Sequence, residues 1–318
     1  MCTKLLRHYP TSIKDPPSGG FFYSYIFRKL LLMKLEQKVL HGFYKLKNTT
    51  LSWTKSDNER RFKENLRNFP DDENLLYYRD NPIQYKLNNY GFRTDIDFKK
   101  GTEGNVFLGC SHTFGSGHHI ENVWSYKVNK EIGGNFLNLG APGTGIGTSS
   151  RLLYYFKDML KVKNIFLFNF HPYRYEYFDP IAEEWLTISP TFDWLAKPRS
   201  TRMYLTKDLQ KILLEDNNME MYYNLHFNKI VNLADYMGAQ LFTVTPLSKQ
   251  QYHYINVNKS KTVGIPSKAR DNHMPISHHN EYTKIALNCY KKKIKPNSTP
   301  QTFQLSEEPS KIFGYKII

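Results

Sequence analysis

The chain of 318 residues has few cysteines and no long apolar run. Its three cysteines, Cys2, Cys110 and Cys289, are an odd number, and their spacing fits neither a disulfide framework nor a zinc ribbon. Arg28 and Lys29 interrupt the apolar residues near the N-terminus, so that stretch is too short to span a bilayer and lacks the form of a signal peptide. We therefore expect a protein of a reducing, cytoplasmic compartment without a transmembrane segment.

Acidic residues are also under-represented. The 44 Lys and Arg residues outnumber the 29 Asp and Glu residues and give a formal net charge of +15. Such an excess suits nucleic acid or an anionic glycan. The basic residues are spread along the chain, however, with one dense run at residues 291–293, and this distribution argues against nucleic-acid binding.

The composition favours a globular protein with a large core, because 40% of the residues are hydrophobic and 15% are aromatic. We expect three parts. Residues 1–72 form a helical, basic N-terminal extension that ends at Pro70-Asp71-Asp72, residues 73–292 form the main domain, and residues 293–318 form a C-terminal tail. Residues 75–98 resemble an extended lead-in with β-prone pieces around Tyr77, at residues 84–87 and at residues 90–92.

Short apolar runs alternate with helical patterns along the main domain. We predict strands at residues 106–108, 136–139, 165–168 and 241–244, and helices at residues 121–132, 219–237, 280–290 and directly after residue 150. This alternation indicates an α/β fold with a parallel sheet covered on both faces, in which an active site lies at the carboxyl ends of the strands. The aromatic insertion at residues 173–202 is expected to form a substrate wall.

Ser111 directly follows the first of these strands, in the sequence GCSHTFG. A serine at such a turn becomes a nucleophile when a base takes its proton and fixed donors receive the developing negative charge. The alternative is that Ser111 caps the following helix.

The glycine-rich loop at residues 140–147 follows the second strand. It lacks the features of a nucleotide site, because Ile146 stands where a phosphate-binding loop needs lysine and Gly147 stands where it needs Ser or Thr. We expect no cofactor. The bare amides of such a loop are suited instead to approach an oxyanion.

Asp271 and His273 lie shortly before the last predicted helix. With Ser111 they have the chain order Ser, Asp, His of a catalytic triad, in which the Asp orients the His and the His takes the serine proton. Surface placement is the alternative for both residues. The other histidines have no helix-borne metal-binding spacing, so we expect no metal site.

Three segments together resemble the SGNH hydrolases, also called GDSL-type esterases and lipases. These are residues 109–113 (GCSHT), residues 138–143 (NLGAPG) and residues 271–273 (DNH), which are similar to blocks I, II and V of that family. Residues 87–93 (LNNYGFR) resemble the lead-in of bacterial and phage-encoded members.

The resemblance implies a flavodoxin-like three-layer sandwich. It also implies that Ser111 is the nucleophile, that His273 is the general base, and that Asp271 orients it. The amides of Ser111 and Gly143 would form most of the oxyanion hole. Further expected substrate contacts are His112, Arg151, Arg174 and His279.

Two departures from the family pattern leave alternatives open. Block III, G-x-N-D, is replaced by residues 169–172 (NFHP), so either Asn169 or His171 would be the third oxyanion donor. One residue, rather than two, separates Asp271 from His273, and His278 or His279 would be the base if the register is shifted.

The expected function is therefore that of a serine esterase that removes an acetyl or other short acyl group from a carbohydrate. The alternatives are a noncatalytic glycan-binding or structural module, associated with a virion, and a sugar O-acyltransferase that uses the same triad. The expected partner is a small-molecule or glycan ester, and the sequence does not indicate an oligomeric state.

Overall fold

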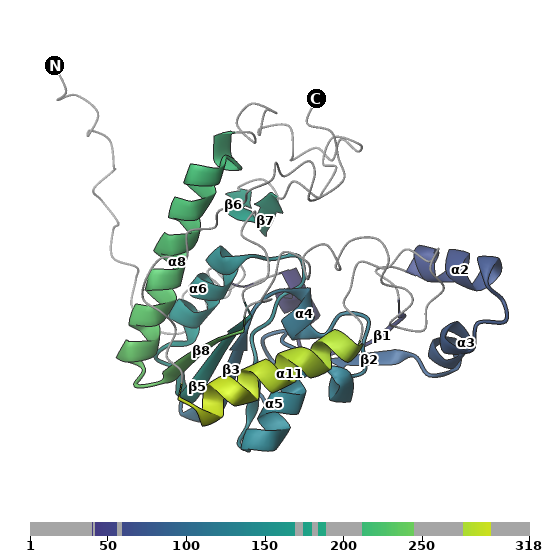
Figure 1. Cartoon of the computed structure of the whole chain (residues 1–318), viewed down its shortest axis with the longest axis horizontal. Coiled ribbons are helices and arrows are strands. Elements are labelled where there is room, and N and C mark those ends of the chain that lie inside the picture. Colours follow the sequence, from purple (N-terminus) through teal and green to yellow (C-terminus); the bar gives the residue numbers. More distant parts are fainter. Residues whose placement is uncertain are drawn as a thin grey trace, which may run out of the picture.

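The centre of the protein is a parallel sheet. The computed structural model describes residues 40, 42–55, 59–168, 174–179, 184–188, 212–244 and 276–293. Within these residues the sheet has four strands in the order β4-β3-β5-β8 (Figure 1). The strands are β3 (Thr102–Leu108), β4 (Phe136–Asn138), β5 (Leu160–Phe168) and β8 (Gln240–Val244). The predicted α/β class and the four predicted strands are confirmed.

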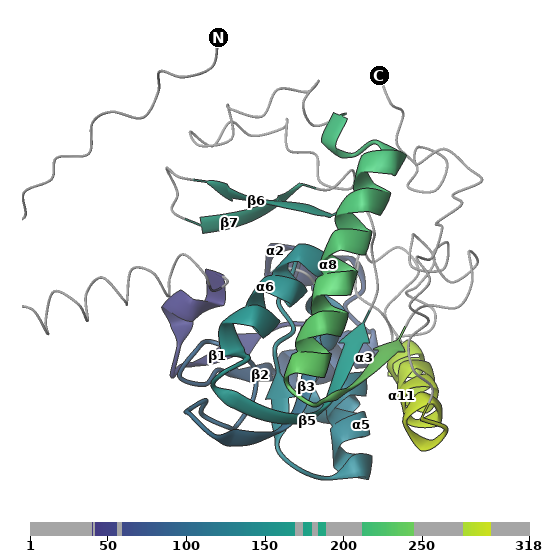
Figure 2. The ribbon, with the colours of Figure 1, turned by 90° about the vertical axis from the view of Figure 1, so that its left-hand side faces the viewer.

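Helices cover both faces of this sheet. On one face lie α6 (Ile146–Phe156) and α8 (Asp216–Tyr236), and on the other lie α5 (Trp124–Ile132) and α11 (Ile276–Lys291) (Figures 1 and 2). The prediction that the sheet is covered on both faces is confirmed. Helix α5 ends at Gly133, as predicted, with φ of +77°.

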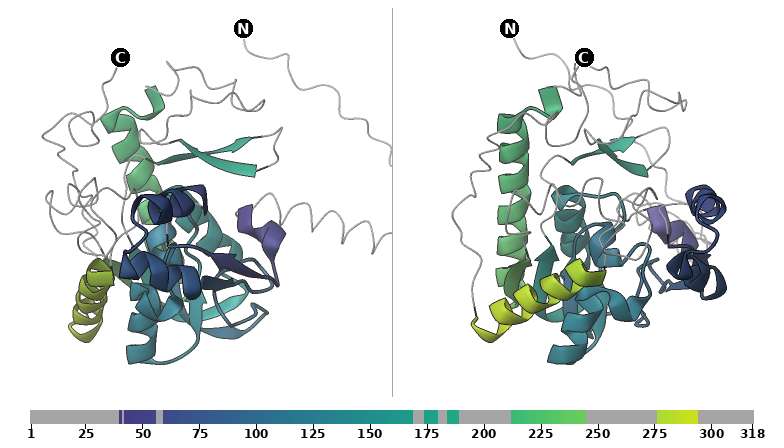
Figure 3. Two further views of the ribbon diagram at one scale, coloured as in Figure 1. Left: turned by 90° about the vertical axis from the view of Figure 1, so that its right-hand side faces the viewer. Right: turned by 45° about the vertical axis from the view of Figure 1, so that its right-hand side comes forward.

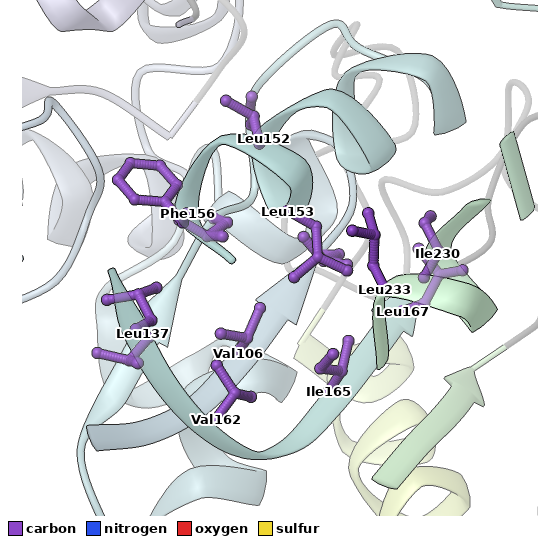
Figure 4. Packing of buried hydrophobic residues seen from close by; sticks show 14 of the residues in the cluster. Val106, Leu137, Leu152, Leu153, Phe156, Val162, Ile165, Leu167, Ile230 and Leu233 are labelled. Atoms are coloured by element: carbon purple, nitrogen blue, oxygen red, sulfur yellow. The ribbon is translucent and has the colours of Figure 1, made fainter. Parts of the chain in front are cut away.

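The strands alternate between two apolar faces because successive side chains point to opposite sides of a sheet. Val106 and Leu108 face α6 and α8, while Phe107, between them, faces α5 and α11. The α6 and α8 face is filled from both helices, mainly by aliphatic side chains (Figure 4). Its side chains include those of Leu137, Leu152, Leu153, Phe156, Val162, Ile165, Leu167, Ile230 and Leu233.

The face toward α5 and α11 is aromatic. Phe166 lies in register with Phe107 on one side and Phe242 on the other, and its ring stacks on both with centroid separations of 5.0 Å. Stacked pairs of this kind contribute about 0.5–1.5 kcal/mol beyond their area burial. The three rings therefore join three adjacent strands at the middle of the sheet.

A second, smaller sheet lies beside the first. Its antiparallel strands are β1 (Thr50–Trp53) and β2 (Ile83–Lys86), and it is accompanied by η1 (Gly42–Leu46), α2 (Glu59–Asn68) and α3 (Glu73–Asp80) (Figure 3). Phe114 of the main domain packs into the apolar cluster of this unit. The division at residue 72 stays a prediction, although β1 and β2 pair across it.

The extended structure expected around Tyr77 is wrong, because Tyr77 lies within α3. The N-cap of this helix is Asp72, whose Oδ1 accepts a hydrogen bond of 2.9 Å from the amide of Leu75. The segment that suggested a boundary in the sequence therefore acts as a helix start. The β-prone piece at residues 84–87 is confirmed in part by β2.

The hairpin of β6 (Tyr175–Asp179) and β7 (Glu184–Ile188) is the described part of the predicted aromatic insertion (Figure 2). It is antiparallel, with Phe178 opposite Trp185. Residues 1–39, 41 and 56–58 of the expected helical extension (residues 1–72) lie outside the described residues, and so does the expected tail (residues 293–318) apart from residue 293. No helix in the described ranges is both long enough and apolar enough to cross a membrane.

Candidate active site at the carboxyl edge of the sheet

The turn that follows β3 requires glycine at its first position. Gly109 has φ of +145°, and a Cβ atom there would lie 2.3 Å from Oγ1 of Thr113 and 3.0 Å from Cβ of Phe168. The turn therefore closes against both the next helix and the end of β5. It leads directly into α4 (Ser111–Phe114), a single helical turn.

Ser111 is the first helical residue of α4 and is 7% exposed. The N-cap is Cys110, which makes no side-chain capping bond, so the alternative in which Ser111 caps the helix is wrong. The carbonyl of Ser111 accepts from the amides of Gly115 and Ser116. Its hydroxyl has no hydrogen-bond partner among the residues that the structure describes, so it remains available for another role.

The glycine-rich loop lies directly against the serine turn. The amide of Ala141 donates to the carbonyl of Gly109 over 2.9 Å. At Gly140 a Cβ atom would lie 2.6 Å from the amide nitrogen of Phe114, which leaves room for glycine alone. These contacts bring together the loops after β3 and β4.

Asn138 joins these two loops through its side chain. Its Oδ1 accepts from the amide of Gly140 over 2.9 Å, and its Nδ2 donates to the carbonyl of Thr113 over 3.2 Å. Oγ of Ser125 donates to the same carbonyl over 3.0 Å. Asn138 is fully buried, so it fixes the position of the loop relative to α4 without contact with solvent.

Gly143 is the expected second amide donor of the oxyanion hole. It has φ of +76°, in the region that favours glycine, and a Cβ atom there would meet nothing within 4 Å. The residue is half-buried, and the space on this side of it is open. The loop therefore presents backbone, rather than side chain, at this position.

Arg93 holds the far end of α4 in place. Its guanidinium donates to the carbonyls of Phe114 (3.2 Å), Gly115 (2.7 Å) and His118 (2.9 Å), and to that of Gln84 in β2 (3.3 Å). Burial lowers the pKa of Arg93 to about 10, which leaves the group charged at neutral pH. A positive charge at the carboxyl end of α4 complements the partial negative charge of its carbonyls.

Lys55, His118 and His279 are buried and form a cluster of basic side chains next to the carbonyls that Arg93 binds. Nζ of Lys55 donates to the carbonyl of Gly117 over 3.0 Å and lies 3.4 Å from both ring nitrogens of His118. The ring of His118 contacts that of His279 edge-on, with centroids 4.7 Å apart. These three side chains join the small sheet, the loop after α4 and the first turn of α11.

His279 was expected as a substrate contact or an alternative base. It is 1% exposed, and its Nδ1 accepts a hydrogen bond of 3.2 Å from the amide of Trp124, the first residue of α5. Because the N-cap of α5 makes no side-chain bond, His279 satisfies an otherwise unpaired amide of that helix.

The remaining predicted residues are divided between described and undescribed segments. His112 is buried, with its ring centroid 5.9 Å from that of Phe168. Arg151 and Arg174 both lie beside the glycine-rich loop, bonded to Glu176 and to the carbonyl of Thr144, respectively. The expected base, its partner and the two candidate third oxyanion donors lie outside the described residues, namely His273, Asp271, Asn169 and His171.

The contributions of Arg93, Lys55 and Glu176 were not predicted from the sequence. Arg93 and Lys55 donate to backbone carbonyls, and Glu176 pairs with Arg151 of α6, so none of these contacts leaves a local sequence pattern. The motif LNNYGFR indicated only a lead-in. No group of three His, Cys, Asp or Glu side chains that could hold a metal ion occurs within the described part of the chain.

The chain matches no protein-family model and no curated protein.

Proposed function

We propose that the protein is a serine esterase of the SGNH type, with Ser111 as the nucleophile and a short acyl ester on a carbohydrate as the substrate. The observation that carries the proposal is the direct contact between the Ser111 turn and the glycine-rich loop. The loop amide of Ala141 bonds to Gly109, and Asn138 bonds to both segments. Nucleophile and candidate oxyanion donors are thereby held in one rigid unit.

The order of the strands supports this proposal. In chain order the four strands of the sheet are arranged 2-1-3-4, which corresponds to the start of the flavodoxin-like order. Sheets of this kind bind ligands at the switch point, between the first and third strands. Here that point lies between the carboxyl ends of β3 and β5, where Gly109 meets Phe168.

The chemistry follows from the backbone at this edge. The hydroxyl of Ser111 would attack the acyl carbon, and the negative charge that develops on the carbonyl oxygen would be received by the amides of Ser111 and Gly143. His273, oriented by Asp271, is the proposed base, and Asn169 or His171 the proposed third donor. The C–O bond of the ester then breaks, and the carbohydrate leaves as an alcohol that takes the proton from the base, which leaves the acyl group on Ser111. Water, deprotonated by the same base, attacks this acyl-enzyme and releases the acyl group as a carboxylic acid and Ser111 as a free hydroxyl.

A fluorophosphonate probe tests the nucleophile, with 4-nitrophenyl acetate as the reporter of hydrolysis. We expect Ser111→Ala to abolish labelling and to lower turnover on the order of 10⁴-fold. Stability should change by no more than about 1 kcal/mol, since the hydroxyl makes no described hydrogen bond. Ser52→Ala is the matched control, because Ser52 is exposed on β1.

Ser125 is unsuitable as that control, because it is fully buried and its hydroxyl bonds to the carbonyl of Thr113 beside the site. If the wild-type protein is not labelled at any pH between about 6 and 9, the esterase proposal fails, and the noncatalytic glycan-binding module takes its place. Labelling that persists in Ser111→Ala would reject Ser111 as the nucleophile but would leave the esterase proposal intact.

A further inference from the structure

Two arginines flank the glycine-rich loop on the side of the β6–β7 hairpin. Arg151 projects from α6 and forms an ion pair with Glu176 of β6, with Nη2 2.5 Å from Oε1 and Nε 3.3 Å from Oε2. Its guanidinium lies over the ring of Trp185, 4.4 Å from the centroid. The hydroxyl of Thr148 also bonds to Glu176, so this carboxylate is fully engaged.

Arg174, the residue directly before β6, packs against the glycine-rich loop. Its Nη1 donates to the carbonyl of Thr144 over 2.8 Å. At Gly145 a Cβ atom would lie 2.8 Å from both Cβ and the carbonyl oxygen of Arg174, so the absence of a side chain at residue 145 permits this approach. Arg174 therefore contacts the glycine-rich loop at Gly145, two residues after Gly143, the proposed oxyanion donor.

The two guanidinium groups have donors that the described residues leave unused. Nη1 of Arg151 and Nε of Arg174 are buried and have no hydrogen-bond partner among the residues that the structure describes. A buried donor without a partner is costly, and in native structures it often marks the place of an absent ligand or water. Here both such donors belong to cations.

Among the described residues, the charges of this cluster do not balance. Glu176 compensates one of the two arginines, and no carboxylate in the described segments forms an ion pair with Arg174. Neither the first turn of α6 nor its N-cap carries an acidic side chain, so the amides there add to the positive potential. An anionic group at this position would use the free donors and compensate the charge.

We infer that Arg174, supported by Arg151, binds a carboxylate of the substrate, and hence that the substrate is the acyl ester of an acidic carbohydrate such as a uronic acid. This inference rests on the proposed esterase function and narrows it. The planar, forked guanidinium matches the two oxygens of a carboxylate, which distinguishes an acidic sugar from its neutral counterpart. The net positive charge of the whole chain also favours the approach of an anionic glycan.

The test compares two acetylated sugars, a uronic acid and the neutral sugar that differs from it only in the carboxylate. We expect the wild-type protein to favour the acidic ester at least tenfold in kcat/KM, because a charge-assisted pair of bonds discriminates by about that factor or more. Arg174→Gln should reduce this ratio to near 1, and Arg174→Lys should leave an intermediate ratio, since lysine keeps the charge but not the fork.

Arg60→Gln is the matched control, because the side chain of Arg60 is 85% exposed on α2, and its ratio should equal that of the wild type. Arg151→Gln is less suitable, because it leaves the buried carboxylate of Glu176 without its cation. Equal kcat/KM values for the two esters in the wild type would overturn the inference while leaving the esterase proposal intact.

A binding measurement tests the anion site independently of the esterase activity. Calorimetry with the free uronic acid should detect binding to wild-type protein, at least tenfold weaker binding to Arg174→Gln, and none of the neutral sugar. If the acid binds in this way but no ester is hydrolysed, the anion site stands and the esterase proposal fails. Absence of binding to wild type would overturn the anion site.

Discussion

At the scale of single residues, Arg93 is the clearest structural determinant of the site. It is 2% exposed and forms no ion pair within the described residues; four backbone carbonyls and the face of Tyr85, 4.3 Å from its guanidinium carbon, surround the charge. Three of those carbonyls belong to α4 and the loop that follows it. The cation therefore positions the helix that begins with Ser111.

We expect Arg93→Met to lower the free energy of unfolding by about 2–4 kcal/mol, because methionine fills much of the space but leaves buried carbonyls without donors. Arg93→Lys should lose less, since its ammonium can still bond to one or two of them. Urea denaturation measures both. Arg79→Met is the control, because Arg79 is exposed, and a loss there as large as in Arg93→Met would contradict this role.

At the scale of elements, the sequence predicted the sheet because each strand is a short apolar run bounded by polar or glycine residues. The same reasoning failed at α3, where Tyr77 and its neighbours have β-prone side chains but a cap at Asp72 and packing of Leu75 determine the conformation. The hydrogen bonds of the Arg93 and Lys55 side chains could not be predicted, because their acceptors lie 9 to 63 residues away in the sequence.

The contact between α6 and α8 includes a serine and a histidine. Oγ of Ser150 lies 2.6 Å from Nδ1 of His226, and Ser150 is fully buried. Burial lowers the pKa of His226 to about 4, and the positive charges of Lys229 and Arg151 act in the same direction. The folded protein therefore holds this imidazole in its neutral form, whereas the unfolded chain protonates near its ordinary pKa of about 6.5.

This difference predicts a dependence of stability on pH. The folded-state pKa lies below the unfolded one, so the contribution of His226 is complete above about pH 6.5 and is lost as the pH falls toward 4. The loss should be on the order of 1 kcal/mol, allowing for the partial exposure of the ring. Urea midpoints at pH 7.5 and 5 measure it. In His226→Gln the difference in the free energy of unfolding between the two pH values, obtained from those midpoints, should shrink by that amount, and an unchanged difference would reject the assignment.

At the scale of the whole molecule, Phe114 connects the small sheet to the candidate active site. Its ring stacks on Phe43 with centroids 5.3 Å apart and meets Tyr85 edge-on at 5.1 Å. Its backbone amide lies against Gly140, and its carbonyl accepts from Arg93. One residue of α4 thus contacts the N-terminal unit, the lead-in and the glycine-rich loop, so the small sheet supports the position of Ser111.

We expect Phe114→Ala to destabilise the protein by about 3–5 kcal/mol and, in conditions where it remains folded, to slow fluorophosphonate labelling of Ser111. The control is Phe156→Ala, which removes an equally buried ring from a different apolar cluster, the one between the main sheet and α6 and α8. It should cost similar stability but leave labelling unchanged. Hydrogen exchange provides the second measurement: in Phe114→Ala the amides of β1 and β2 should lose protection together with those of α4. If labelling slows equally in both variants, the effect is one of global stability, and the small sheet has no specific part in positioning Ser111.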